Sequence, residues 1–167
     1  MVLRQRFYEL IEAAREGSEP STPSADAAAL EESLLTLDSE ELVEFVLAFD
    51  DELIRLNHWS VWGAGYIAEG GLSDDGFHYF RGWLIGKGMR AVDAVLQDPD
   101  ALADFLDDGD HENEDLEYAG VGLLQDRGLA DPREADGRVH ADAQPAGEPF
   151  DEDTVEDAYP RTAAAAD

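Results

Sequence analysis

The densest group of side chains able to do chemistry in this sequence lies within residues 74–81. Asp74 and Asp75 supply carboxylates, His78 an imidazole and Arg81 a guanidinium. On a helix, spacings of four and three residues place Asp74, His78 and Arg81 on one face. Such a face can bind a polar ligand or a partner. Asp74 and His78 could also serve a divalent ion if another segment supplied a third ligand.

The same residues have a purely structural interpretation. Ser73 is a good helix N-cap, and Asp74 and Asp75 would then lie in the first turn, where the helix dipole favours negative charge. Arg81 would form a structural ion pair. We therefore treat these four residues as a candidate ligand or partner site, and we predict no catalytic residue, no metal site and no cofactor.

Aromatic residues surround this group. They are Trp59, Trp62, Tyr66, Phe77, Phe80 and Trp83. Aromatic-lined clefts with a few polar groups are common ligand sites, so the three tryptophans join the candidate site residues. Their helical spacing equally favours core packing, because large aromatic side chains dominate the cores of small domains. Both interpretations stay open at this point.

Two helices are predicted to position these side chains. The first begins near Trp59 and ends at Gly70-Gly71, where a left-handed residue is easily accommodated. The second begins after Ser73 and continues through Ile85. Gly82 lies inside the second helix despite its low helix propensity, and close backbone packing is one reason to tolerate it there.

Apolar residues at helical spacing predict further helices on both sides. A stripe from Leu3 ends at Gly17, and a short helix capped by Ser24 carries Leu30, Leu34 and Leu35. The clearest stripe follows a capping pair, Asp38 and Glu41, and consists of Leu42, Phe45, Val46, Phe49, Leu53 and Leu56. Later helices are predicted from Met89, from Asp98-Pro99 and from Leu116 to Gly128.

The whole pattern predicts an all-α, single-domain, irregular bundle of six to seven helices, since no convincing alternating strand pattern occurs. We expect residues 1–128 to form the helical domain. Residues 129–148 lack periodicity and are expected to form a flexible acidic linker. Residues 149–167 are expected to form a tail that packs back on the domain.

Composition narrows the functional classes. The 167 residues include 40 acids and 11 bases, a net charge of −29, and no cysteine. Without cysteine, disulfides, thiolate metal sites and cysteine nucleophiles are excluded. Residues 98–167 hold 22 acids and 4 bases, a net charge of −18, against 18 acids and 7 bases, net −11, in residues 1–97. The C-terminal part is therefore the more acidic.

The negative charge also predicts the kind of partner. It repels phosphate backbones and anionic lipid headgroups, so we expect no binding to nucleic acid or to membranes. It favours a basic protein partner instead. Because no apolar run has the length of a signal peptide core or a membrane span, we expect a cytoplasmic protein.

The block from Trp59 to Ile85 resembles a bacterial family of uncharacterised proteins, domain of unknown function 4240. The residues that carry the resemblance are Trp59, Trp62-Gly63-Ala64, Tyr66, Gly70-Gly71, Ser73-Asp74-Asp75-Gly76-Phe77 and Tyr79-Phe80-Arg81-Gly82-Trp83-Leu84-Ile85. The resemblance extends to Phe7-Tyr8-Glu9-Leu10-Ile11 near the start, and to Gly147 to Asp153 and Tyr159-Pro160-Arg161 near the end. The resemblance implies one domain whose tail returns to the fold. It implies no activity, because the family has none assigned.

Three functional hypotheses follow. The first is a non-enzymatic cytoplasmic interaction or regulatory module whose acidic surface binds a basic protein, since the sequence carries none of the common catalytic signatures. The second is a small-ligand-binding protein or enzyme that uses the polar cluster of the Trp59 to Ile85 block. The third is an immunity-like acidic inhibitor, which fits the net charge but is indicated by no particular residue.

Overall fold

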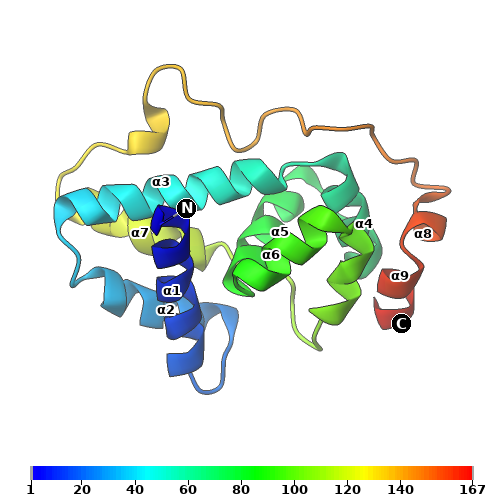
Figure 1. The fold of residues 1–167 in the computed structure, drawn as a ribbon, viewed down its shortest axis with the longest axis horizontal. Coiled ribbons are helices and arrows are strands. Elements are labelled where there is room, and N and C mark those ends of the chain that lie inside the picture. The colour runs from blue at the N-terminus through cyan, green and yellow to red at the C-terminus, as the bar shows by residue number, and fades with distance from the viewer. Residues whose placement is uncertain (1, 167) are drawn as a thin grey trace.

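The computed structural model describes residues 2–166, and these residues are mainly helical (Figure 1). The elements in chain order are α1 (Val2–Gly17), α2 (Pro23–Leu34), α3 (Ser39–Leu56), α4 (Trp59–Glu69), α5 (Asp74–Gly86), α6 (Met89–Gln97), the 3-10 helix η1 (Pro99–Asp104), α7 (Asp115–Asp126), the 3-10 turn η2 (Pro132–Glu134), α8 (Val155–Ala158) and α9 (Pro160–Ala166). Because no strand forms among residues 2–166, the all-α prediction is confirmed.

Local capping chemistry sets the starts of the helices that position the site. The Asp38 carboxylate accepts the N–H groups of Glu40 and Glu41, both at 3.0 Å, and the Glu41 carboxylate accepts the Asp38 N–H at 3.1 Å. The predicted capping pair of α3 is thus confirmed. The hydroxyl of Ser73 likewise accepts the N–H of Gly76 at 3.1 Å at the start of α5, as predicted.

The predicted start of α2 was wrong by two residues. Thr22, not Ser24, is the N-cap, and its hydroxyl accepts the N–H of Ala25 at 3.2 Å. Pro23 then occupies the first helical position, where its fixed φ suits the helix and its missing N–H leaves no bond unmade. Leu35 was expected in the apolar stripe of α2, but it follows the helix and is exposed.

Helix α3 joins the two parts of the bundle. It contacts α1 and α7 in one part and α5 in the other, while α2 packs against both α1 and α7 (Figure 1). Every residue of the stripe predicted from Leu42 to Leu56 is buried, as expected for a helix facing the core. Leu3, placed in the stripe of the first helix, is exposed instead.

Gly82 lets α5 approach the loop before α7. A Cβ atom on Gly82 would lie 2.6 Å from the backbone oxygen of Asn113, closer than real Cβ atoms come to a neighbour. In the same place the Asn113 N–H donates to the carbonyl of Tyr79 at 3.1 Å. The close backbone packing inferred from this glycine is therefore present.

Residues 127–154 run along one edge of the bundle from α7 to α8, drawn yellow to orange in Figure 1. Within 129–148 only Ala141 is buried. The flexibility of this range remains a prediction. Beyond it, α9 packs against η1 and α4, and Thr162 of α9 is fully buried.

Candidate functional site

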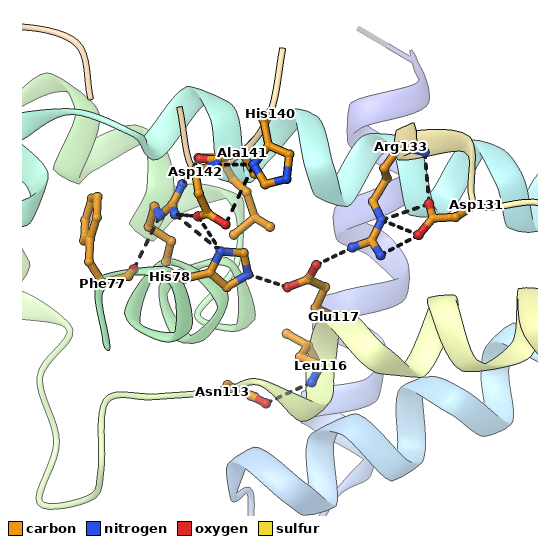
Figure 2. Close-up of polar contacts among 12 residues, drawn as sticks. Phe77, His78, Asn113, Leu116, Glu117, Asp131, Arg133, His140, Ala141 and Asp142 are labelled. Atoms are coloured by element: carbon orange, nitrogen blue, oxygen red, sulfur yellow. Dashed lines mark hydrogen bonds and ion pairs between the residues drawn. The ribbon is translucent and has the colours of Figure 1, made fainter. Parts of the chain in front are cut away.

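Two of the predicted site residues, His78 and Arg81, contact the same carboxylate, that of Asp142, which lies far from them in the sequence. From α5, His78 Nδ1 lies 2.7 Å from Asp142 Oδ1, and Arg81 Nη2 donates to the same oxygen at 2.7 Å. Figure 2 shows the Asp142 carboxylate beside the ring of His78. The spacing of three residues between His78 and Arg81 thus creates a small cationic site on α5, and the C-terminal segment fills it.

The network extends to α7 and to the turn that follows it. His78 Nε2 lies 2.7 Å from Glu117 Oε2, and the other oxygen of Glu117 pairs with Arg133. Arg133 also pairs with Asp131, with Nη2 2.6 Å from Oδ2 (Figure 2). Positive and negative groups therefore alternate from Arg81 to Asp131, and they tie residues 131–142 to α5 and α7.

The two carboxylates determine the charge of His78. Burial opposes protonation, but the hydrogen bonds to Asp142 and Glu117 outweigh it and raise the pKa of His78 to about 9. The bond to His78 lowers the pKa of Asp142 to about 2, and Arg81 contributes further, although burial opposes both. Near pH 7 His78 is therefore a cation with both ring nitrogens engaged.

Arg81 is almost fully buried, with 1 % of its surface exposed. Its Nη1 donates to the carbonyls of Leu53 at 3.0 Å and Ala141 at 2.7 Å, and its guanidinium carbon lies 4.7 Å from the centroid of the Phe77 ring. A buried guanidinium is tolerated only when its donors are satisfied and its charge is paired. Here the pairing comes from Asp142.

A cleft of about 480 Å³ opens beside this network. Asp74 and Asp75 are exposed in its lining, and so is Glu134. The lining residues are Asp50, Asp74, Asp75, His78, Tyr79, Glu117, Tyr118, Asp131, Arg133, Glu134, Val139, His140, Ala141 and Asp142. Tyr118 and Val139 are large apolar or aromatic side chains that remain exposed there.

A second cleft of about 280 Å³ adjoins the first, and Asp74 and Asp142 line both. Trp59 and Trp62 stack with ring centroids 5.1 Å apart, and Trp62 stacks on Phe77 at 4.8 Å. The Trp62 indole donates to the carbonyl of Leu72 at 3.0 Å. The buried indole N–H of Trp59 finds no acceptor among residues 2–166.

Trp83 does not belong to this site. It lies on α5, packs against Phe80 with ring centroids 5.5 Å apart and meets His111 edge-on at 4.6 Å. The ammonium of Lys87 lies 5.0 Å from the centroid of its ring. Of the seven candidate residues, the structure therefore gathers Asp74, Asp75, His78, Arg81, Trp59 and Trp62 around the two adjoining clefts and leaves Trp83 outside.

Residues 3–127 match the family described as "Protein of unknown function (DUF4240)". The chain belongs to this family. The matched range covers nearly all of α1 and the rest of the bundle through α7, so it contains the whole Trp59 to Ile85 block. No curated protein and no solved structure matches the chain.

The DUF4240 match ends before the C-terminal segment, although the resemblance noted from the sequence included residues of the tail. Asp142, Arg133 and Asp131, which complete the network, therefore lie outside the matched range. Sequence reasoning missed these three together with Glu117. No local spacing links them to His78, because Glu117 is 39 and Asp142 is 64 residues away along the chain.

Proposed function

We propose that this DUF4240 protein is a cytoplasmic, non-enzymatic interaction module that binds a cationic segment of a protein partner in the 480 Å³ cleft. The supporting observation is the charge balance of the cleft lining. Seven carboxylates line it, and its arginine and His78 are already paired with Glu117, Asp131 and Asp142. Asp74, Asp75 and Glu134 form no ion pair among residues 2–166 and remain available to a partner.

The rim of the cleft supports the same type of ligand. Tyr118 is 54 % and Val139 is 61 % exposed. The aliphatic part of a lysine or arginine side chain packs on such surfaces while its charged end reaches a carboxylate. The net charge of −29 would also attract a basic partner over longer distances at low salt.

The state of His78 favours binding over catalysis. A general base works best with a pKa near the working pH and with a free lone pair. The carboxylates of Asp142 and Glu117 raise the pKa of His78 to about 9 and occupy both ring nitrogens. His78 is therefore better suited to organise this site than to take up a proton from a substrate near pH 7.

A small-ligand receptor is the second candidate. It is supported by the aromatic cleft at Trp59 and Trp62, which has a volume of about 280 Å³ and a buried indole N–H without an acceptor among residues 2–166. A metabolite screen monitored by the ligand-induced rise in Tm tests it. A saturable change that Trp59→Phe abolishes would favour this function over the first.

Binding of a labelled hexa-arginine peptide tests the proposed function. The site variant is the triple substitution Asp74→Asn, Asp75→Asn, Glu134→Gln. The matched control, Glu31→Gln, Glu32→Gln, Glu44→Gln, removes the same charge from exposed positions that form no ion pair among residues 2–166. Fluorescence anisotropy is measured for both variants and for the native chain at 50 and 200 mM salt.

We expect the site variant to bind the peptide about tenfold more weakly than the control, since three carboxylate contacts at about 0.5 kcal/mol each sum to roughly 1.5 kcal/mol. Affinity should fall with added salt in the native chain and in the control. Equal weakening in the two triple variants would mean that only net charge matters, and the cleft proposal would be rejected.

A further inference from the structure

Residues 141–146 lie against the bundle as a bound peptide would, with a turn at Ala141-Asp142 followed by an irregular stretch to Ala146. Asn57, between α3 and α4, contacts this segment twice: its side-chain amide donates to the carbonyl of Ala143 at 2.7 Å, and its carbonyl accepts the Ala146 N–H at 2.9 Å. The Trp59 N–H donates to the carbonyl of Ala146 at 2.9 Å. His58 and Ala146 accordingly form a parallel bridge.

One side chain of this segment is recognised as well as its backbone. Arg81 contacts the Ala141 carbonyl through Nη1 and the Asp142 carboxylate through Nη2, each at 2.7 Å. His78 holds the same carboxylate oxygen at 2.7 Å. A buried arginine and a protonated histidine that meet at one oxygen select a carboxylate.

Little apolar burial holds the segment in place. Ala141 is the only buried residue within 129–148, and the Asp142 side chain is 48 % exposed. Segments with few buried apolar contacts open locally at a small fraction of the global free energy of unfolding. Opening would leave Arg81 buried without its carboxylate, which is costly, so the vacated groove would favour another carboxylate ligand.

We propose that Asn57, Trp59, His78 and Arg81 form a docking groove for a peptide that carries an aspartate, and that residues 141–146 occupy this groove as an internal ligand. All four groove residues belong to the range that matches the family, whereas the occupying segment follows it. Ala146 and His58 form a single parallel bridge, and we expect such main-chain bonds to give affinity while the side-chain site gives specificity.

This groove and the neighbouring cleft share Asp74 and Asp142 in their linings, but different side chains recognise their ligands. The two ligands have opposite charge, and the cleft ligand is recognised by Asp74, Asp75 and Glu134. Failure of the hexa-arginine experiment would not count against the groove. Failure of the groove experiments would likewise not count against the cationic ligand of the cleft.

The carboxylate site is tested first in the full chain, with acetate as the probe. Asp142→Ala empties the site, and Asn57→Ser is the control because it loosens the same segment while Asp142 stays in place. Thermal unfolding is compared in sodium acetate and sodium chloride at equal ionic strength. Acetate at ten times its dissociation constant should raise the Tm of Asp142→Ala by about 2–4 °C more than chloride does. The native chain and Asn57→Ser should show no such difference.

Peptide recognition is tested with a full-length double variant, Asp142→Ala with Ala146→Pro, which loses both the carboxylate and the N–H that Asn57 accepts. A labelled peptide of residues 139–148 is titrated against it. We expect saturable binding at least about tenfold tighter than to the native chain, whose own segment competes at millimolar effective concentration. A peptide with asparagine at the position of Asp142 should bind at least about tenfold more weakly.

Equal binding of the aspartate and asparagine peptides would overturn the proposed selectivity. An absence of peptide binding to a folded double variant would overturn the groove. If the double variant does not fold, the acetate experiment on Asp142→Ala decides alone, and an equal Tm in acetate and chloride would then reject the carboxylate site.

Discussion

The guanidinium of Arg81 lies 2.7 Å from the carboxylate of Asp142. Arg81 is only 1 % exposed, whereas the side chain of Asp142 is 48 % exposed. The two residues are 61 positions apart, and only Arg81 lies within the range that matches the family. A buried cation of the bundle is therefore neutralised by a segment that contributes almost nothing else to the core. The stability of the bundle and the attachment of this segment should be coupled through this pair.

Asp142→Asn should lower the free energy of unfolding by about 1–3 kcal/mol. Removing one partner of a fully buried pair costs about 3–5 kcal/mol, and the half-exposed carboxylate reduces that figure. Urea unfolding followed by circular dichroism measures it. Asp136→Asn, an exposed position in the same segment, should change stability by less than about 0.5 kcal/mol. Similar losses in both variants would argue against a special role for the Arg81 pair.

The pKa of His78 predicts a pH dependence. Its folded value of about 9 lies above the unfolded value of 6.5, so its stabilising contribution is complete below pH 6.5 and disappears as the pH rises through 9. The shift corresponds to about 3 kcal/mol. The stability difference between the native chain and His78→Gln should shrink by roughly this amount from pH 6 to pH 10. A difference that does not vary with pH would show that His78 is neutral in the fold.

Asp142 should change the stability of the protein at low pH. Its folded pKa of about 2 lies below the usual 3.8, so its contribution is present above pH 3.8 and is lost as the pH falls toward 2. Carboxyl chemical shifts followed by NMR between pH 2 and pH 6 measure this pKa. A midpoint near 3.8 would mean that Asp142 is not paired in solution.

A separate buried ion cluster predicts a large stability effect far from the clefts. Glu52 is 3 % exposed, accepts hydrogen bonds from Arg4 and Arg55 at 2.8 Å and receives the hydroxyl of Tyr8 at 2.5 Å. Glu52→Gln should cost about 2–4 kcal/mol, because it removes the buried carboxylate between Arg4 and Arg55 and leaves them only the exposed Asp93. Glu44→Gln, which is exposed, is the control in urea unfolding. Equal stability of the two variants would show that the cluster contributes little.

Two glycine substitutions with opposite expected signs test the packing of α5. Gly82→Ala should destabilise the protein by about 1–3 kcal/mol, since its Cβ would meet the backbone oxygen of Asn113. Gly122→Ala, on α7 with nothing within 4 Å of the added Cβ, should stabilise it by up to about 1 kcal/mol. Thermal unfolding of both variants measures the signs, and stabilisation by Gly82→Ala would contradict the close approach.

The sequence predicted those features that depend on neighbouring residues. The capping pair Asp38 and Glu41, the Ser73 cap and the buried stripe of α3 arise from interactions within one or two turns, and all three are present. Local patterns were less informative where two caps compete: Thr22 and Ser24 are both good N-caps, and Pro23 decided in favour of Thr22. The exposure of Leu35 follows from the end of α2 one residue earlier.

The site was predictable only in part, for the same reason. Spacing placed His78 and Arg81 on one face of α5, but their partners come from α7 and from a segment without periodicity. Asp142 resembles any other acid in an acidic chain of 40 acids. Only the path of the chain, which brings residues 141–146 back to Asn57 and Trp59, distinguishes it.

Chemical-shift mapping of a hexa-arginine titration on the isotopically labelled full chain tests the central claim, a cationic ligand in the 480 Å³ cleft, most directly. The largest shifts should fall on Asp74 to Tyr79, Tyr118 and residues 134–142, with smaller changes at other exposed acids such as Glu31, Glu32 and Asp153. Shifts spread evenly over the acidic surface would contradict a defined cleft site. Shifts concentrated elsewhere, such as at residues 151–157, would place the partner surface on another face.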